Sequence, residues 1–68
     1  MVAENIKNII NNAGIKQKSI AEKAGYSIQQ FSNLLNGRKI ITDVDVFRIA
    51  MALGVTPNEL YGINTETS

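Results

Sequence analysis

The residue types that this chain lacks limit its chemistry. It has no cysteine, no histidine and no tryptophan, and it has one proline in 68 residues. Without cysteine there is no disulfide and no thiolate metal site to add stability, and without histidine there is no imidazole base. Its carboxylates form no acid–base cluster either. The sequence therefore predicts no metal site, no cofactor, no small-molecule substrate and no enzyme active site.

Long apolar segments are also missing. Apolar runs extend over only a few residues, whereas a membrane-spanning helix needs roughly 20. The N-terminus has no apolar stretch of the length found in secretion signals. We therefore expect a soluble cytoplasmic protein. Apolar content is 44% with few aromatic residues, which favours an aliphatic core.

Charge is distributed unevenly, although the formal net charge is only +1. Residues 1–39 hold six Lys and Arg against two Glu, a net charge of +4, whereas residues 40–68 hold one Arg against four acidic residues, a net charge of −3. One basic side and one acidic side suit a domain that meets a polyphosphate with a single surface. Chance unevenness in a short chain is the alternative.

Apolar residues recur at the three- and four-residue spacing of helices, and no alternating strand pattern occurs. The pattern predicts helices over residues 3–12, 17–24, 28–36, 43–53 and 57–61. Glycines follow the helix ends as left-handed stops at Gly14, Gly25, Gly37 and Gly54. We predict an all-α fold, a compact bundle of five short helices over residues 1–62, followed by a polar tail over residues 63–68.

The start of the third predicted helix carries the clearest local signals. Ser27 and Gln30 have the spacing of a capping box, in which each side chain bonds the backbone amide of the other residue. Tyr26 and Phe31 have the spacing of a hydrophobic staple across this cap. A capped helix is thus predicted directly after a tight turn at Gly25.

This helix has two different faces. The side that can be buried carries Phe31, Leu34 and Leu35, and the opposite side carries Gln29, Asn33 and Asn36, with Ser32 on its flank. Amide side chains can pair with two atoms of adenine in a DNA major groove. An ordinary solvated face is the alternative interpretation.

The fourth predicted helix, capped by Thr42, is apolar on two sides. One stripe suits the core and consists of Val46, Ile49, Ala50 and Leu53. The second stripe consists of Val44, Phe47 and Met51. Because a helix this apolar must be covered twice, the second stripe is expected either to bind a partner or second copy, or to pack under the last helix. The last helix begins with a further capping box, at Thr56 and Glu59.

In this order the elements resemble a known family. A glutamine-led helix, a glycine turn, a capped helix, and then helices containing IAMALGV and TPNEL look like the lambda-repressor-like helix-turn-helix domains of the Cro/C1 and XRE type. The likeness extends over residues 6–62. Its most specific parts are Gln17, Ala21 and Gly25 at their mutual spacing, together with those two segments. The resemblance implies that the capped helix enters the major groove of DNA.

Carried over by position, the resemblance implies two groups of DNA contacts. The residues that read bases are Ile28, Gln29 and Asn33. The residues that contact the DNA backbone are Gln17, Ser27, Gln30, Ser32, Asn36, Arg38 and Lys39. Other roles stay open: the capping box can occupy Gln30, Ile28 can shield the edge of the core, and the cations can be solvated loop residues.

Two departures from the family pattern matter. Many members pair an arginine late in the first helix with a glutamate near the end of the third, but this chain has Ile10 and Leu35 there. A hydrophobic contact is therefore expected in place of the ion pair. Lys16 stands where a serine, threonine or asparagine usually caps the second helix, so that helix is expected to begin without a side-chain cap.

The sequence thus favours a transcriptional regulator that binds double-stranded DNA, reads its sequence with residues 28–36, acts as a repressor and binds as a homodimer. The alternative is a protein-interaction module, such as an antitoxin or the subunit of a co-regulator. In that case the second apolar stripe of the fourth helix would be the interface.

Overall fold

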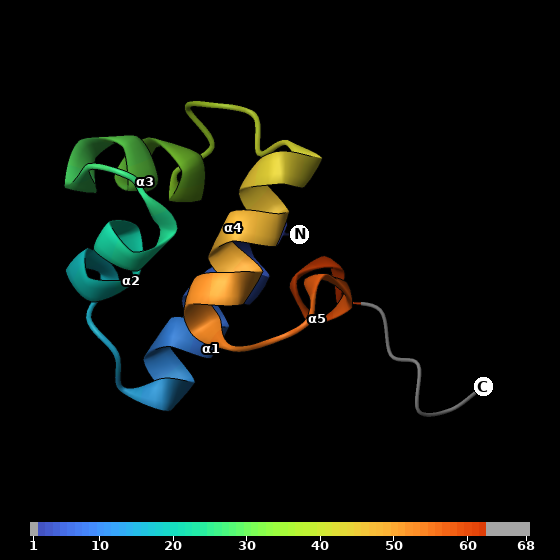
Figure 1. Ribbon diagram of the computed structural model, residues 1–68. Coiled ribbons are helices and arrows are strands. Elements are labelled where there is room, and N and C mark those ends of the chain that lie inside the picture. The colour runs from blue at the N-terminus through green and yellow to red at the C-terminus, as the bar shows by residue number, and fades with distance from the viewer. Residues whose placement is uncertain (1, 63–68) are drawn as a thin grey trace.

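Five α-helices form the part of the chain that the computed structural model describes, residues 2–62 (Figure 1). They are α1 (Val2–Ala13), α2 (Gln17–Ala24), α3 (Ile28–Leu35), α4 (Asp43–Leu53) and α5 (Pro57–Tyr61). No strand occurs within these residues. The predicted all-α bundle is therefore confirmed. The predicted tail at 63–68 lies outside the described residues, so the division of the chain at residue 62 stays a prediction.

Two of the predicted helices differ slightly from the structure at their ends. α1 extends one residue further at each end than predicted. α3 ends at Leu35, so the prediction that it includes Asn36 is wrong. Asn36 has left the helical conformation, with φ −93° and ψ 4°, and its backbone N–H bonds Ser32 O at 2.9 Å. Gly37 then takes a positive φ of 76° and turns the chain out of the helix.

Side chains satisfy the free backbone amides at the starts of α3 and α5, as predicted. Ser27 Oγ accepts from the backbone N–H of Gln30 at 3.1 Å, and Gln30 Oε1 accepts from the backbone N–H of Ser27 at 2.9 Å. Thr56 and Glu59 form the same reciprocal box at α5. α2 has no side-chain cap at Lys16, which confirms the expected departure there.

The core is aliphatic apart from Phe31, and every helix contributes to it. Its buried side chains are Ile6, Ile10, Ile20, Ala21, Ala24, Phe31, Leu34, Leu35, Val46, Ile49, Ala50 and Leu60. Ile10 and Leu35 are only 2% and 3% exposed, so apolar packing has replaced the family's ion pair, as expected. Among residues 2–62, no polar or charged side chain is buried.

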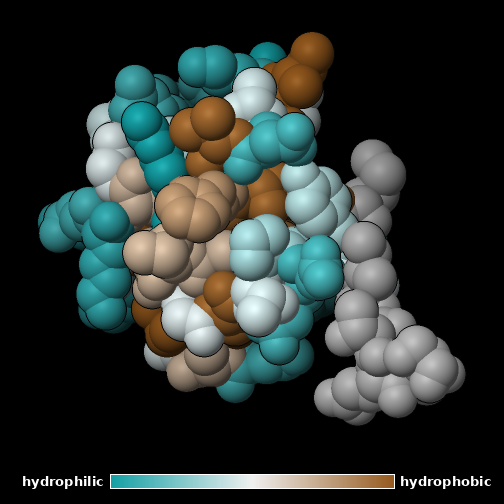
Figure 2. All heavy atoms as spheres, turned by 45° about the vertical axis from the view of Figure 1, so that its right-hand side comes forward, coloured by the Kyte–Doolittle hydropathy of each residue, from teal (hydrophilic) through white to brown (hydrophobic). Residues whose placement is uncertain are grey.

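The second apolar stripe of α4 lies in solvent. Val44, Phe47 and Met51, which we call the α4 apolar face, are 60%, 57% and 67% exposed. Figure 2 shows apolar side chains gathered in the middle of one side of the molecule. The alternative that this stripe packs under the last helix is wrong, because α5 inserts Leu60 into the core and leaves the stripe uncovered.

Tyr26 ties the turn between α2 and α3 to α4. Its hydroxyl donates to Asp45 Oδ1 at 2.5 Å, and its ring stacks on Phe31 with centroids 6.1 Å apart, which confirms the predicted staple. Asp45 Oδ2 also accepts from the backbone N–H and the hydroxyl of Thr42, each at 3.0 Å. One carboxylate therefore caps α4 and holds Tyr26. This box at Thr42 was not predicted, because its third residue is Asp rather than Glu or Gln.

Both partners of this bond have shifted pKa values. Partial burial, and then the bond to Asp45, raise the pKa of Tyr26 from 10.0 to about 12. Burial alone would raise the pKa of Asp45, but hydrogen bonds from Tyr26 and Thr42 outweigh it and lower this pKa below 3.8. The folded carboxyl thus binds a proton less tightly than the unfolded one. Asp45 stabilises the fold above pH 3.8, and this contribution is lost as the pH falls through the lower folded pKa.

Replacing Tyr26 by Phe keeps the stack on Phe31 and removes the bond to Asp45. We expect Tyr26→Phe to lower the free energy of unfolding at neutral pH by about 1 kcal/mol. The difference in the free energy of unfolding between Tyr26→Phe and the unsubstituted protein should shrink as the pH falls below 3.8, because Asp45 then becomes protonated in both proteins. Urea unfolding followed by circular dichroism at neutral and at low pH measures both effects.

Tyr61 provides a matched control. Its hydroxyl donates to Asp43 Oδ1 at 2.6 Å, but its side chain is 42% exposed. Tyr61→Phe should destabilise the fold less than Tyr26→Phe, because water readily replaces the lost partner of an exposed group. Equal losses in the two variants would contradict a particular role for Tyr26.

Candidate nucleic-acid interface

α3 lies at the surface of the bundle beside α2, with one polar side in contact with solvent (Figure 1). Its other side is anchored in the core by Phe31, Leu34 and Leu35. On the polar side, Gln29 is exposed and Asn33 is half-buried. Both predicted base-reading amides are therefore accessible to a ligand rather than packed inside the bundle.

α2 and the turn after it set the direction of α3. Gly25 has a φ of 87°, a left-handed conformation in which a side chain would introduce strain. The backbone N–H of Tyr26 then bonds Ala21 O at 2.8 Å and closes the end of α2. Ala21 and Ala24 are small and buried, so α3 can pack close to α2. Backbone geometry, rather than a flexible linker, thus positions the polar side of α3.

The polar side chains of α3 and of Asn36, which follows it, are hydrogen-bonded in pairs whose members are four residues apart. Gln29 Nε2 donates to Asn33 Oδ1, and Asn36 Nδ2 donates to Ser32 Oγ, each at 3.1 Å. These residues were predicted singly, although polar side chains four residues apart on a helix are a recognised signal for such pairs. The polar side of α3 is therefore a connected set of groups.

The start of α3 offers an apolar side chain and an amide. Ile28 is 52% exposed, so much of it is available for contact with a ligand. Gln30 uses its oxygen to accept from Ser27, and this leaves the N–H donors of its amide for another partner. Its capping role and a contact with DNA are therefore compatible.

Two exposed cations, Arg38 and Lys39, follow α3. Their backbone N–H groups bond Asn33 O at 3.0 and 3.3 Å, so this loop is held against the end of the helix. Gln17 is exposed at the start of α2, where no side chain caps the first turn. Free amides and the positive end of a helix dipole favour an anion at such a position.

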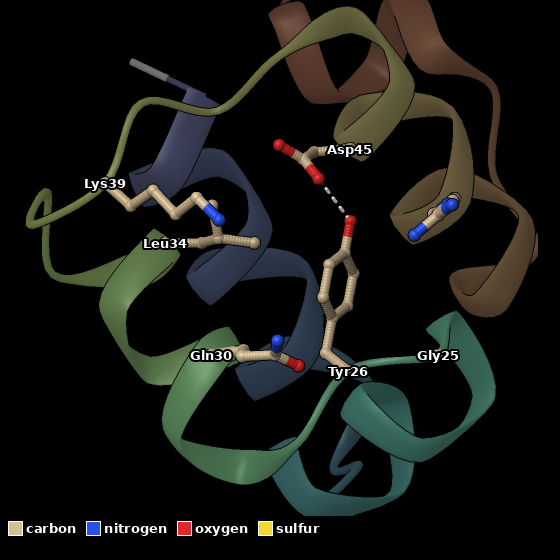
Figure 3. A pocket seen from close by; sticks show the side chains of 7 residues that line it. Gly25, Tyr26, Gln30, Leu34, Lys39 and Asp45 are labelled. Carbon is tan, nitrogen blue, oxygen red and sulfur yellow. Dashed lines mark hydrogen bonds between the residues drawn. The ribbon is translucent and has the colours of Figure 1, made fainter.

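A cleft of about 200 Å³ separates the α2–α3 turn from α4 (Figure 3). It is lined by Gly25, Tyr26, Gln30, Leu34, Lys39, Asp45 and Arg48. The Tyr26 ring stands in the cleft with its hydroxyl toward Asp45, whose carboxylate also bonds Thr42. Because these bonds already occupy the carboxylate, the polar groups of the cleft hold α4 to the turn. No local sequence pattern indicates this cleft, because Tyr26 and Asp45, which meet in it, are 19 residues apart.

Residues 2–62 contain no group of three or more acidic, histidine or cysteine side chains close enough to hold a metal ion. In the same range no helix is long and apolar enough to cross a membrane. Amides, hydroxyls and cations are the polar chemistry that α3 and the loop after it offer to a ligand.

Comparison with known proteins agrees with this geometry. Residues 3–64 match the family model described as a helix-turn-helix domain. The chain is 31% identical over 67 residues to a protein of Sinorhizobium fredii (strain NBRC 101917 / NGR234) named uncharacterized HTH-type transcriptional regulator y4dJ, and the alignment covers 98% of this chain and 87% of that protein. No solved structure matches the chain significantly. The chain therefore belongs to the helix-turn-helix domain family, as an XRE-like DNA-binding domain.

Proposed function

We propose that this chain is a transcriptional regulator that binds double-stranded DNA sequence-specifically and represses its target, and that it is not an enzyme. The observation that carries the proposal is the accessible polar side of α3, held rigidly by α2 and the turn at Gly25. The similar Sinorhizobium fredii protein carries the name of a transcriptional regulator, which supports this assignment.

In the proposed complex α3 lies in the major groove. Gln29 and Asn33 bond base edges, because their amides combine donors and an acceptor as adenine does. Ile28, which is half-exposed at the start of the helix, contacts a thymine methyl group or a sugar. These few contacts supply discrimination between sequences rather than most of the affinity.

Affinity in this proposal comes from the DNA backbone. The proposed contacts are made by Gln17, Ser27, Gln30, Ser32, Asn36, Arg38 and Lys39. Arg38 and Lys39 neutralise phosphates and release counterions, so binding weakens as salt increases. Because the basic residues are few, non-specific binding should be weak.

We propose that two copies bind two half-sites about one helical turn apart. The α4 apolar face supports this, because large exposed apolar patches mark interaction surfaces. Other exposed apolar groups neighbour it in the chain or in space, namely Ile40 in the preceding loop, 84% exposed, and Tyr61, which bonds Asp43 at the start of α4. Repression is the output we propose, because occupation of DNA by a small dimer is sufficient to block access to it.

The α4 apolar face also favours a second candidate, a protein-interaction module that docks on a different protein. The two functions differ in what the purified chain does alone. A regulator shifts a specific duplex, whereas an interaction module binds its partner tightly and no duplex.

Selection of binding sites from random duplexes, followed by substitution of the readers, tests the proposed function. Gln29→Ala and Asn33→Ala should each relax base preference within the selected half-site and weaken specific binding by roughly 1–3 kcal/mol. Fluorescence anisotropy with the selected duplex and single-base variants measures this. Failure of the purified chain to enrich any sequence would overturn the proposal.

Arg38→Ala tests the proposed phosphate contact. We expect it to weaken all duplexes alike, without changing base preference. The slope of log K against log salt should become shallower by about 1. Lys23→Ala is the matched control. Lys23 is an exposed cation in the last turn of α2, away from Gln17 at the start of that helix, and it has no proposed phosphate contact. Equal changes of slope in both variants would show a diffuse field and no specific contact.

Phe47→Ser tests the proposed dimer surface. Sedimentation of the unsubstituted chain at micromolar concentration should show a dimer, at least on DNA, and the variant should sediment as a monomer. Binding to the full two-half-site duplex should fall by about a hundredfold, because the two copies no longer bind jointly. Asn58→Ser, on the exposed surface of α5, should change neither result. A chain that stays monomeric with and without DNA would exclude the dimer.

A further inference from the structure

Gln29 and Asn33 form one hydrogen-bonded unit on the polar side of α3. Gln29 Nε2 donates to Asn33 Oδ1 at 3.1 Å. A primary amide has two N–H donors and one oxygen with two lone pairs. The bond therefore occupies part of the hydrogen-bonding capacity of each side chain before any ligand arrives.

The two amides keep different free atoms. The Asn33 oxygen is engaged with Gln29, so the Asn33 N–H groups are those that point away from this bond. Gln29 keeps its oxygen and one N–H. Reversal of the Asn33 amide alone would bring its N–H groups against the Gln29 donor, and two donors repel each other. The two amides can therefore reverse only together, and in the arrangement that the structure shows Asn33 offers its N–H groups to a ligand.

We infer that Gln29 and Asn33 read nearby base pairs as a coupled unit, in which Gln29 pairs with adenine and Asn33 acts as a hydrogen-bond donor. This inference rests on the proposed function and deepens it. Adenine presents an amine and N7 in the major groove, which match the free oxygen and N–H of Gln29.

The donor role of Asn33 defines which bases it accepts. Guanine offers O6 and N7 and thymine offers O4, and these acceptors fit a side chain that presents N–H groups. Cytosine presents only its amine in the major groove, so it has no acceptor for Asn33. The base opposite Asn33 is therefore one that offers an acceptor, as guanine, thymine and the N7 atom of adenine do, and cytosine is excluded.

The decisive variant is Gln29→Met, which keeps the length of the side chain and removes its amide. The side-chain amide of Asn33 can then rotate freely. The preference for the base that Asn33 contacts should therefore change, although Asn33 itself is intact. Discrimination against cytosine at that base should fall by at least about threefold, a typical coupling between contacting residues. The base that belongs to Asn33 is identified as the position where Asn33→Ala abolishes preference in site selection.

A double-mutant cycle gives an independent readout. The losses of affinity caused by Gln29→Met and Asn33→Ala should not multiply in the double variant. We expect the double variant to bind at least about threefold more tightly than the product of the single losses indicates. Anisotropy titrations of the four proteins on the selected duplex measure the coupling.

Ser32→Ala is the matched control, because it breaks the neighbouring pair in which Asn36 donates to Ser32 at 3.1 Å, also four residues apart. Whatever its effect on affinity, it should leave the order of the four bases at the Asn33 position unchanged. A change as large as that caused by Gln29→Met would mean that the helix as a whole had been perturbed, and would overturn the inference.

The remaining outcomes separate this inference from the proposed function. If DNA is selected but Gln29→Met leaves the Asn33 base unaltered and the losses multiply, the two amides read independently and the inference fails while the regulator stands. If cytosine is preferred opposite Asn33, the donor assignment fails. If no sequence is enriched, both the proposed function and the inference fail.

Discussion

The hydrogen bond from Tyr26 to Asp45 is the constraint on which the arrangement of the helices depends. Tyr26 precedes the cap of α3, stacks on Phe31 in the core and donates to a carboxylate that also caps α4. One side chain therefore fixes the entry angle of α3 and the position of α4 at the same time. Together with the backbone geometry at Gly25, this junction positions the polar side of α3, although neither Tyr26 nor Asp45 belongs to the proposed DNA contacts.

The helix caps supply much of the stability that a larger core would otherwise give. The buried residues are few and almost all aliphatic, the chain has no cysteine for a disulfide, and residues 2–62 hold no cluster of possible metal ligands. Three of the five described helices begin with a reciprocal capping box, and a cap typically contributes about 1 kcal/mol. α2 lacks one at Lys16, so no side chain caps the backbone amides of its first turn. The start of α2 is thus one of the places with a proposed contact to the DNA backbone, through Gln17.

Sequence patterns predicted most of the fold because its determinants are local. Helix periodicity identified the core. Ser27 and Gln30, which are only three residues apart in the sequence, identified the start of α3. Two features were not predictable in this way. The bond from Tyr26 to Asp45 joins residues 19 apart, and its existence depends on how the helices pack. The exposure of the α4 apolar face depends on where α5 lies, which the amphipathic pattern of α4 does not determine. For the site, the accessible face of α3 was predictable from helix periodicity, but the hydrogen bonds between its polar side chains were not, because they depend on the rotamers that the side chains adopt.

The length of α3 connects the exposed apolar face of α4 with DNA recognition. α3 has eight residues and is about 12 Å long, which matches only three or four base pairs along a groove. A site of four base pairs recurs about once in 250 positions of random sequence, far too often among the millions of competing sites in a genome. If a second α3 is held at a fixed spacing, both half-sites must occur together. The expected frequency of a chance match is then squared, without any new type of contact. The dimer that we propose meets this requirement, and the α4 apolar face, which α5 leaves uncovered, is the surface that we propose for it.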